Sequence, residues 1–455
     1  MTSHRPERIS LLAVSLSLGL TACGNESSST ARSGGEELDP RPDVVLVVVD
    51  TLRADRLGCY GHERATSPQL DRFAEGAVLY ERAISQAPWT TPSIASLLTS
   101  RYPTQLGILG ERSAIPEEAT TLAESLSSEG YSTAAVVSHS YCSTTWGFGQ
   151  GFEGFDDSNV KGHAAVTSTG VTDRAIAFLE AASEDPRPFF LWVHYFDPHC
   201  AYVEHEEHTF GGVGDYRGPV RSGQLFRRLL KLRPELGTED VSELFRLYDS
   251  EIAHTDAELG RFLSSLDELH PGALVVVTSD HGEEFMEHGD LGHAKTLYDE
   301  VVRVPLLVRY PDGLAGVEPR TVGLVDVFPT VLETIGSEIA EDLEGRSLRS
   351  APKSLAGRIV FTETSRMGGL TAAVTDEAKV VHGTRYDEVS GFDLRTDPLE
   401  RRPRSLEDPE RQRLAAELEA FARRVKEGAL IAPEVEVDGK LGQHLNELGY
   451  GGDDD

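Results

Sequence analysis

The chain has 455 residues, which is enough for one large domain or for a large domain with a smaller companion. Its hydrophobic content of 39% and charged content of 26% are typical of a soluble globular protein. The formal net charge of −32 repels nucleic acid, which argues against nucleic-acid binding, and an anionic substrate would need a local cation.

The N-terminal segment has the pattern of a bacterial lipoprotein signal peptide. Basic Arg5 and Arg8 precede an apolar run over residues 9–20, which is too short to cross a membrane. The sequence LTACG (residues 20–24) then resembles a lipobox, in which Cys23 is lipidated and becomes the first mature residue. The alternative is an ordinary secretory signal with an incidental cysteine. Because two or three acyl chains anchor a protein stably, we expect attachment to the bacterial cell envelope, facing the periplasm or the exterior.

Changes in composition along the chain predict five segments. Residues 24–41 are rich in Ser, Gly, Glu and Pro, which is typical of a flexible tether. The predicted segments are a signal peptide at 1–22, a tether at 23–41, an α/β catalytic domain at 42–355, a C-terminal subdomain at 356–430 and an acidic tail at 431–455.

Short apolar runs alternate with helical patterns from residue 44 onward. The runs lack polar alternation, as strands covered on both faces do, and they predict strands at 44–49, 133–137, 189–193, 274–278 and 305–308. Helical patterns between them predict helices at 93–99, 122–128, 172–182, 240–266 and 327–335. This repetition favours a doubly wound α/β sheet with helices on both faces.

The chain changes character after residue 356, where the sequence predicts a small antiparallel sheet. Its short strands are expected at 359–362, 372–375, 378–382 and 391–394. An amphipathic helix follows over residues 409–425, with Asp408 as its N-cap and Pro409 in its first turn.

Polar residues follow the predicted strands where each strand ends, and ligands bind at those carboxyl ends in sheets of this kind. One such residue is more often a cap or a buried hydrogen-bond partner. Asp50, Asp280 and His281 together favour a ligand set, because carboxylates and an imidazole bind a divalent ion. We therefore predict one ion, and the sequence leaves open whether it is Ca²⁺, Mg²⁺, Mn²⁺ or Zn²⁺.

The segment TTPSIASLLT (residues 90–99) predicts the start of a helix, with Thr91 as N-cap and Pro92 in the first turn. Thr90 would then lie at the positive end of the helix, where backbone N–H groups stabilise an oxyanion or a transferring phosphoryl group. A hydroxyl there becomes a nucleophile when a metal ion lowers its pKa. The same residues would also make an ordinary helix start.

Taken together, these segments resemble a known family. Residues 42–402 are similar to the bacterial sulfatase-like proteins of the alkaline phosphatase superfamily, which implies that fold and an ester hydrolase activity. The resemblance rests on PDV (42–44), DTLRAD (50–55), SPQLD (67–71), TPSIASLLTSRYPTQLG (91–107), FLWVHYFDPH (190–199), SDHGEEFMEHG (279–289), LYDE (297–300), RVPL (303–306), VDVFPT (325–330), FDL (392–394), DP (397–398) and Glu400.

The resemblance also implies roles for single residues. Asp50, Asp280 and His281 match metal ligands, and Thr90 matches the nucleophile, which also binds the metal. His199 matches a contact to the substrate oxyanion.

Two further positions stay less defined. His293 or Lys295 matches the family's cationic region before Tyr298, and the spacing does not choose between them. His139 lies near the place where formylglycine sulfatases have a Lys and a His, although the surrounding motif is absent.

Three departures from the family pattern bear on the substrate. Formylglycine forms from Cys or Ser, and the extra methyl group of Thr90 prevents its conversion to an aldehyde. The Arg that follows in the motif is Ile94, and the second acid of the usual Asp-Asp pair is Thr51. The remaining set resembles the single-metal site of lipoteichoic acid synthases and phosphoethanolamine transferases, and half of the two-metal site of nucleotide pyrophosphatases. Candidates for a second site, which do not assemble into a convincing set, are Asp197, His194, His199, His254, His288 and His293.

The sequence thus predicts an exported, lipid-anchored, metal-dependent hydrolase of sulfuric or phosphoric esters, in which Thr90 is the nucleophile. Phosphoester chemistry is favoured, because a sulfated threonine is hard to release. The alternatives are a phosphoryl transferase of the phosphoethanolamine or glycerol-phosphate type, and a catalytically degenerate binding lipoprotein. The expected partners are an anionic ester and the membrane, and the sequence does not indicate an oligomeric state.

Overall fold

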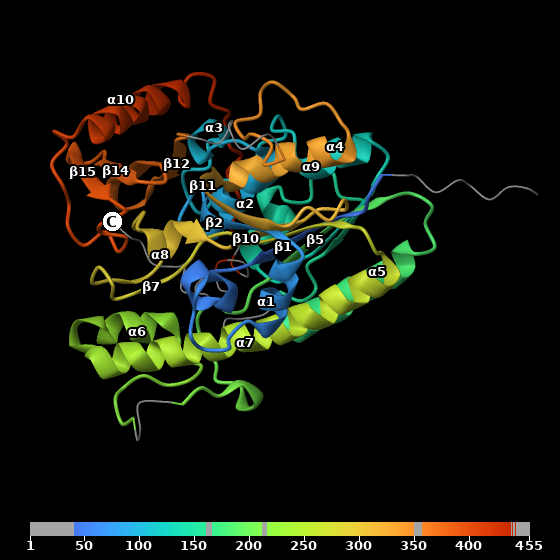
Figure 1. Ribbon diagram of the computed structural model, residues 1–455, viewed down its shortest axis with the longest axis horizontal. Helices are drawn as coiled ribbons and strands as arrows, with labels where there is room; N and C mark the ends of the chain where they lie inside the picture. Colours follow the sequence, from blue (N-terminus) through green and yellow to red (C-terminus); the bar gives the residue numbers. More distant parts are fainter. Residues whose placement is uncertain are drawn as a thin grey trace, which may run out of the picture. The chain divides into compact units, whose positions relative to one another are not determined.

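A mixed nine-stranded sheet lies between two layers of helices in the computed structural model of the chain (Figure 1). The structure describes residues 41–437 except 161–165, 212–215 and 350–356, together with residues 439 and 442. The strand order is β11-β2-β10-β6-β1-β5-β3-β4, and β9 pairs with β2. The strands are β1 (Val44–Val49), β2 (Val78–Ile84), β3 (Ser132–Val136), β4 (Gly154–Asp156), β5 (Phe189–Tyr195), β6 (Leu274–Ser279), β9 (Arg303–Val304), β10 (Leu306–Arg309) and β11 (Gly316–Gly323).

Strand β1 is the centre of this sheet because its valines are buried on both faces. It pairs in parallel with β5 on one side and with β6 on the other. Side chains that alternate along β1 enter two separate hydrophobic cores, one with Val44, Leu46 and Val48 and the other with Val45 and Val47.

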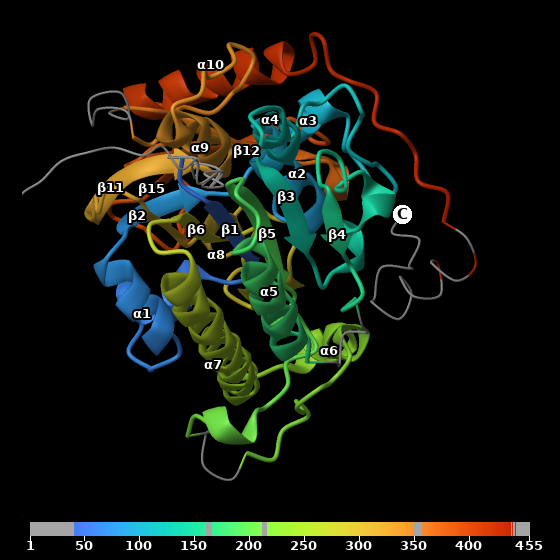
Figure 2. The ribbon, with the colours of Figure 1, turned by 90° about the vertical axis from the view of Figure 1, so that its right-hand side faces the viewer.

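Each core is closed by its own helices, as Figure 2 shows. Ile94, Leu122 and Val327 bring three helices to the first core, whereas Leu179 and Phe262 belong to helices on the second. The first group is α2 (Thr90–Thr99), α4 (Leu122–Ser128) and α9 (Val327–Ile335), and the second is α1 (Pro68–Glu75), α5 (Ser168–Ala182) and α7 (Thr238–Leu269). The predicted doubly wound α/β fold is therefore confirmed.

The sheet differs from the prediction at its β2 side. The strand predicted at 305–308 exists as β10, but it runs antiparallel to both β6 and β2. Two strands of this side were not predicted: β2, whose centre carries charged Glu81 and Arg82, and β11, a partly exposed edge strand that contains Pro319. Neither strand shows the continuous apolar run that revealed the central strands.

The predicted C-terminal sheet is also present. Its antiparallel strands are β12 (Val360–Thr364), β13 (Leu370–Val374), β14 (Ala378–Gly383) and β15 (Glu388–Asp393), in that order. Helix α10 (Pro409–Arg424) covers one face with Leu414, Leu418 and Phe421. Asp408 caps this helix as predicted, because its side chain accepts hydrogen bonds from the N–H groups of residues 410 and 411.

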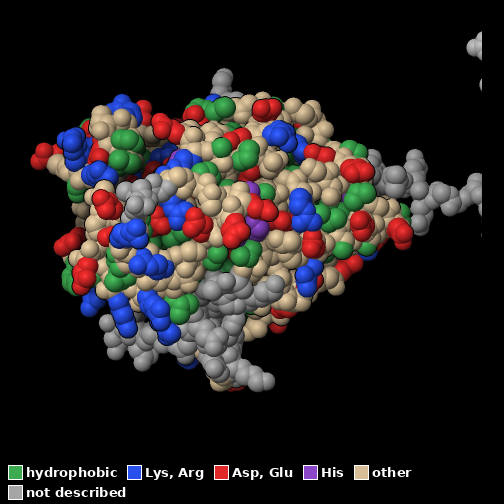
Figure 3. All heavy atoms as spheres, turned by 90° about the horizontal axis from the view of Figure 1, so that it is seen from below, with side chains coloured by type: hydrophobic (Ala, Val, Ile, Leu, Met, Phe, Trp, Pro, Cys, Tyr) green, Lys and Arg blue, Asp and Glu red, His purple; other side chains and the backbone are tan. Residues whose placement is uncertain are grey.

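The predicted signal peptide, Cys23 and most of the tether lie outside the described residues, as does most of the acidic tail. Within the described residues, no helix combines the length and the apolar character that a membrane span requires. Figure 3 shows one face on which hydrophobic side chains are scattered among acidic and basic ones.

A buried ion cluster ties the C-terminal sheet to the main body. The Lys379 ammonium lies 3.1 Å from an Asp299 oxygen and 2.9 Å from a Glu400 oxygen, and the Lys379 side chain is fully buried. Asp299 begins the short helix α8 (Asp299–Val302) and also binds Arg82 at 2.8 Å. The ammonium thus compensates two carboxylates that come from separate parts of the chain.

Replacing Lys379 with Met should lower the free energy of unfolding by roughly 3–5 kcal/mol, because a buried carboxylate loses its cation. Equilibrium urea unfolding measures this difference. Arg395→Met is the matched control, since the Arg395 side chain is 63% exposed and its acidic partners are 3.5 and 3.7 Å away. The control should change stability by less than about 1 kcal/mol. Equal effects of the two substitutions would contradict this account of the cluster.

Candidate active site

Three acidic or imidazole side chains meet at the carboxyl edge of the central strands. Val49 pairs with Ser279 of β6 and with Tyr195 of β5, so Asp280 and Asp50 follow at the same level. His194 pairs with Val48 and therefore points to the same side of the sheet as Asp50. That side is the one on which α2 packs.

The resulting cluster contains buried polar atoms that lack ordinary partners. Asp50 is fully buried, and neither of its carboxylate oxygens has a hydrogen-bond partner among the described residues. The same holds for Oδ2 of Asp280 and for both ring nitrogens of His194. One ligand atom each from Asp50, His194 and Asp280 lie within 4.8 Å of one another. Buried orphan carboxylates are strongly unfavourable, so the two carboxylates fit a shared cation.

Histidine 281 completes the cluster. Its Nε2 lies 3.7 Å from Oδ1 of Asp50 and 3.4 Å from Oδ2 of Asp280. Its Nδ1 lies 2.9 Å from the carbonyl oxygen of Gly282, which can only accept a hydrogen bond. The proton therefore belongs on Nδ1, and the Nε2 lone pair faces the carboxylates, as a metal ligand requires.

The electrostatics of the cluster point the same way. Burial raises the pKa of Asp50 well above its ordinary value, and the nearby charges of Asp280 and Glu283 raise it further. Burial also raises the pKa of Asp280 and lowers the pKa of His194 to about 3. Both carboxylates would ionise readily beside a divalent ion, and a neutral imidazole is the form that binds metal.

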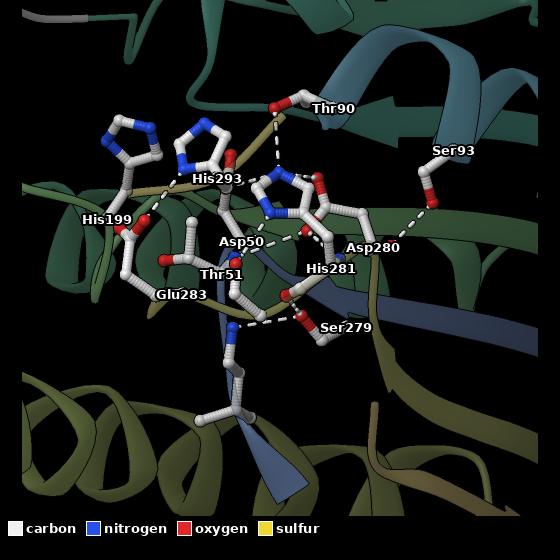
Figure 4. A network of polar contacts seen from close by, with 12 residues as sticks. Asp50, Thr51, Thr90, Ser93, His199, Ser279, Asp280, His281, Glu283 and His293 are labelled. Atoms are coloured by element: carbon white, nitrogen blue, oxygen red, sulfur yellow. Dashed lines mark hydrogen bonds and ion pairs between the residues drawn. The ribbon is translucent and has the colours of Figure 1, made fainter. Parts of the chain in front are cut away.

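Helix α2 places Thr90 above this cluster (Figure 4). The Thr90 hydroxyl lies 3.3 Å from Nε2 of His281, and the Thr90 side chain is almost fully buried. The Ser93 hydroxyl donates to the Asp280 carbonyl oxygen at 2.6 Å, which fixes the first turn of the helix to the end of β6.

The predicted helix cap was wrong by two residues. The helix begins at Thr90, and the preceding extended residue is Trp89. Thr91 lies inside the first turn, so its hydroxyl cannot act as an N-cap. The correction leaves Thr90 at the positive end of the helix, where the sequence analysis expected it.

His199 and His293 lie beside the cluster. The His293 ring centroid is 4.4 Å from that of His281 and 5.2 Å from that of His199. His293 Nδ1 lies 2.9 Å from a Glu283 oxygen, whereas His199 Nδ1 lies 3.0 Å from the Cys200 carbonyl oxygen. The Nδ1 atom of His293 therefore contacts a carboxylate, whereas the Nδ1 atom of His199 contacts an uncharged carbonyl group.

The structure separates His293 from Lys295 and also places His139. Lys295 lies 3.5 Å from Oδ2 of Asp290 and is partly exposed, so His293 is the one of the two alternatives that the structure brings to the cluster. The buried His139 ring stacks on Phe196 at 4.9 Å and lies 5.9 Å from the His199 ring, at the rim of the site.

Three of the six candidates for a second metal site belong to other networks, whereas His194, His199 and His293 lie at or beside the cluster. Asp197 accepts hydrogen bonds from the N–H groups of Thr167 and Ser168 at the start of α5. The His254 ring stacks on His205. His288 Nδ1 contacts Glu300, and with Glu284 these two form a separate cluster of possible donors. Among the described residues, the group at the sheet edge is therefore Asp50, His194 and Asp280, which is separate from Glu284, His288 and Glu300.

Sequence reasoning did not assign roles to two of the residues that complete the site. Glu283 is quoted within SDHGEE, but only the structure shows that it binds His293 and Tyr202. His194 follows the strand predicted at 189–193 and was a candidate for a second metal site, but its place beside Asp50 depends on strand register.

Comparisons with known proteins agree with this geometry. Residues 42–337 match the sequence profile of the family described as Sulfatase. An ulvan-active sulfatase of Formosa agariphila is 26% identical over 384 residues, covering 78% of this chain and 72% of that protein.

Solved structures show the fold. A protein solved in complex with its substrate D-glucosamine-2-N,6-O-disulfate superposes with a TM-score of 0.70 at 21% identity, over 85% of this chain and 98% of the other. A phosphonate monoester hydrolase of Agrobacterium radiobacter gives a TM-score of 0.67 at 20% identity, over 88% and 99%.

The donor set predicts how divalent ions affect stability. A free ion at 100 times its dissociation constant should stabilise the protein by about 2.7 kcal/mol, and a chelator should reverse this. Asp50→Asn keeps the side-chain shape but removes one buried charge. We expect this variant to be at least as stable as wild type in chelator and to lose most of the stabilisation by ions.

Thermal unfolding with and without ions measures both effects. Asp157→Asn is the control, because Asp157 is exposed and far along the chain from the cluster. A full ion-dependent shift retained by Asp50→Asn would rule out the proposed donor set.

Proposed function

Because the chain belongs to the sulfatase family of ester hydrolases, we propose that it hydrolyses phosphoric or sulfuric esters with Thr90 as the nucleophile. The observation that carries this proposal is the position of the Thr90 hydroxyl, 3.3 Å from Nε2 of His281 and above two buried carboxylates. A threonine that served only to start the helix would not require ligands from β1 and β6 beneath it.

The residues that would hold the ion are Asp50, Asp280, His281 and Thr90. A bound divalent ion would lower the pKa of the Thr90 hydroxyl, whose proton passes to solvent, and would draw charge from the ester oxygens. The α2 N-terminus adds backbone N–H groups that favour a negative charge at the same point.

The chain's own residues supply the remaining chemistry. The Thr90 oxygen attacks the central phosphorus or sulfur atom while the bond to the leaving oxygen breaks. His199 contacts a non-bridging oxygen through the nitrogen opposite Nδ1. We assign protonation of the leaving oxygen to His293, because Glu283 stabilises its imidazolium form. Water then displaces Thr90 and gives its proton to His293.

Phosphoester substrates fit this site better than sulfate esters. Attack by a plain alcohol on phosphorus gives a phosphothreonine that water can open by in-line displacement. A sulfated threonine is harder for water to hydrolyse, and Thr90 cannot provide the aldehyde chemistry of formylglycine. The resemblance of the ligand set to phosphoryl-transfer enzymes supports the same choice.

The first test concerns the nucleophile. Thr90→Ala should reduce phosphoester turnover by roughly 10³-fold or more, while Thr90→Ser should keep measurable activity because it retains a hydroxyl. Aryl phosphate, phosphodiester and sulfate esters should be compared with each divalent ion. We expect phosphoester turnover to exceed sulfate turnover, and trapped substrate should add mass to the peptide that contains Thr90.

Thr91→Val is the matched control. Its hydroxyl is buried without a hydrogen-bond partner among the described residues, so its loss should leave turnover within a few-fold of wild type. Equal turnover by wild type and Thr90→Ala would exclude the nucleophile assignment. No turnover of any ester, together with retained ligand binding, would favour the degenerate binding protein.

We further propose that Cys23 carries a lipid anchor that holds the enzyme at the cell envelope. The support is the basic start, the short apolar run and the LTACG sequence. Cys23→Ala should move the protein from the membrane fraction to the soluble fraction or leave its signal peptide uncleaved, and it should abolish labelling by a fatty acid. Unchanged labelling would contradict the anchor.

A further inference from the structure

The site contains a second imidazole that the proposed ligand set does not use. His194 comes from β5, and its Nε2 lies 3.7 Å from Oδ2 of Asp50. On the other side of Asp50, Nε2 of His281 lies 3.7 Å from Oδ1. Each oxygen of one carboxylate therefore faces a different histidine.

An ordinary structural histidine would be tied down by hydrogen bonds. His194 is fully buried, yet neither ring nitrogen has a hydrogen-bond partner among the residues that the structure describes. Buried polar atoms of this kind are rare in proteins unless an ion or water completes them. The neighbouring atoms without hydrogen-bond partners are the Asp50 oxygens and Oδ2 of Asp280, so a single cation between them and His194 would satisfy all of these atoms.

We propose that His194 is a further metal ligand, and that the ion at this site is a borderline transition ion of the zinc class, not Ca²⁺ or Mg²⁺. This inference rests on the metal site of the proposed function. It adds a ligand from a third strand and narrows the choice of ion.

The chemistry of the donors decides the class of ion. Ca²⁺ takes six to eight oxygen ligands, and Mg²⁺ prefers oxygen and keeps several waters. Imidazole nitrogen suits Zn²⁺ and its transition-metal neighbours. Donors that each lie about 2.0–2.2 Å from one Zn²⁺ are roughly 3–4 Å apart. Four neighbouring pairs of donor atoms have separations of this size: Thr90–His281 at 3.3 Å, His281–Asp280 at 3.4 Å, and His281–Asp50 and His194–Asp50 at 3.7 Å. Asp50, His194 and Asp280 each offer a ligand atom within 4.8 Å of the other two.

The strand register explains why His194 can take part. Asp280, Asp50 and His194 come from β6, β1 and β5, which are neighbours in the sheet. Their side chains share one face because His194 lies opposite Val48, two residues before Asp50. The three donors are therefore held by the backbone of the central sheet, whereas a loop residue would need to fold over the site.

Spectroscopy of the unmutated protein gives the first test. Cu²⁺ serves as a probe, because pulsed electron paramagnetic resonance detects each coordinated imidazole by its nitrogen coupling. We expect two imidazoles in the wild-type site and one in His194→Gln. A single imidazole in wild type would overturn the proposal even if the variant failed to fold.

Competition gives the second test. Zn²⁺ should bind the intact protein in the presence of excess Ca²⁺ or Mg²⁺, and His194→Gln should weaken Zn²⁺ binding by roughly 10- to 100-fold or more. His254→Gln is the matched control, because His254 also has a buried Nε2 without a hydrogen-bond partner but stacks on His205 elsewhere. It should leave both the nitrogen couplings and the Zn²⁺ affinity unchanged.

Either of two results of the competition experiment would also overturn the inference: displacement of Zn²⁺ by Ca²⁺ or Mg²⁺, or equal Zn²⁺ affinity in wild type and His194→Gln. Ester hydrolysis is measured in a different experiment, so the hydrolase function and the identity of the ion are tested independently. An enzyme that hydrolyses esters with Ca²⁺ would refute the inference and keep the function. Two-imidazole Zn²⁺ binding without hydrolysis would refute the function and keep the inference.

Discussion

The structure depends on the repulsion between carboxylates that the central sheet holds together in its interior. Asp50 and Asp280 end neighbouring strands, and Glu283 lies close enough to raise the pKa of Asp50. Such a group of charges is unstable without a compensating cation. Around it, the fold supplies groups that suit a cation: imidazole nitrogens from β5 and from the end of β6, and a hydroxyl from α2. The proposed function follows from that requirement, because an ion bound there would lie next to a hydroxyl at a helix N-terminus.

The sequence predicted the elements that are dominated by hydrophobic burial. The bounds of β1, α4 and α9 agree with the predicted ranges, because each presents an unbroken apolar run or an apolar helix face to a core. Strand β2 escaped prediction because Glu81 and Arg82 interrupt its apolar residues, and β10 was not expected to run antiparallel. Strand direction depends on connections between distant segments, and short apolar runs do not encode it.

Some residues of the candidate site could likewise be predicted from the sequence, and others could not. Asp50, Asp280 and His281 could be predicted because each directly follows a recognisable strand, and Thr90 because it precedes a helix. His194 also directly follows a predicted strand, but its place beside Asp50 depends on the register between β1 and β5. The place of Glu283 could not be predicted, because it depends on a contact to His293, ten residues away. Spacing alone left His293 and Lys295 as alternatives, and only the side-chain contacts separate them.

The departures from the family pattern have local structural reasons. Ile94 is fully buried in the core beside the central strands, where an arginine would bring an uncompensated charge into an apolar layer. Thr51 offers no carboxylate, but its backbone N–H donates to Oδ1 of Asp280 at 3.2 Å and so still supports the ligand set. The position that lost an acid therefore orients a ligand instead of supplying one. In the proposed site, fewer carboxylates and more imidazoles at one ion would lower the negative charge that an anionic ester must approach. In a chain with a net charge of −32, that reduction would favour binding of the anionic substrate that we propose.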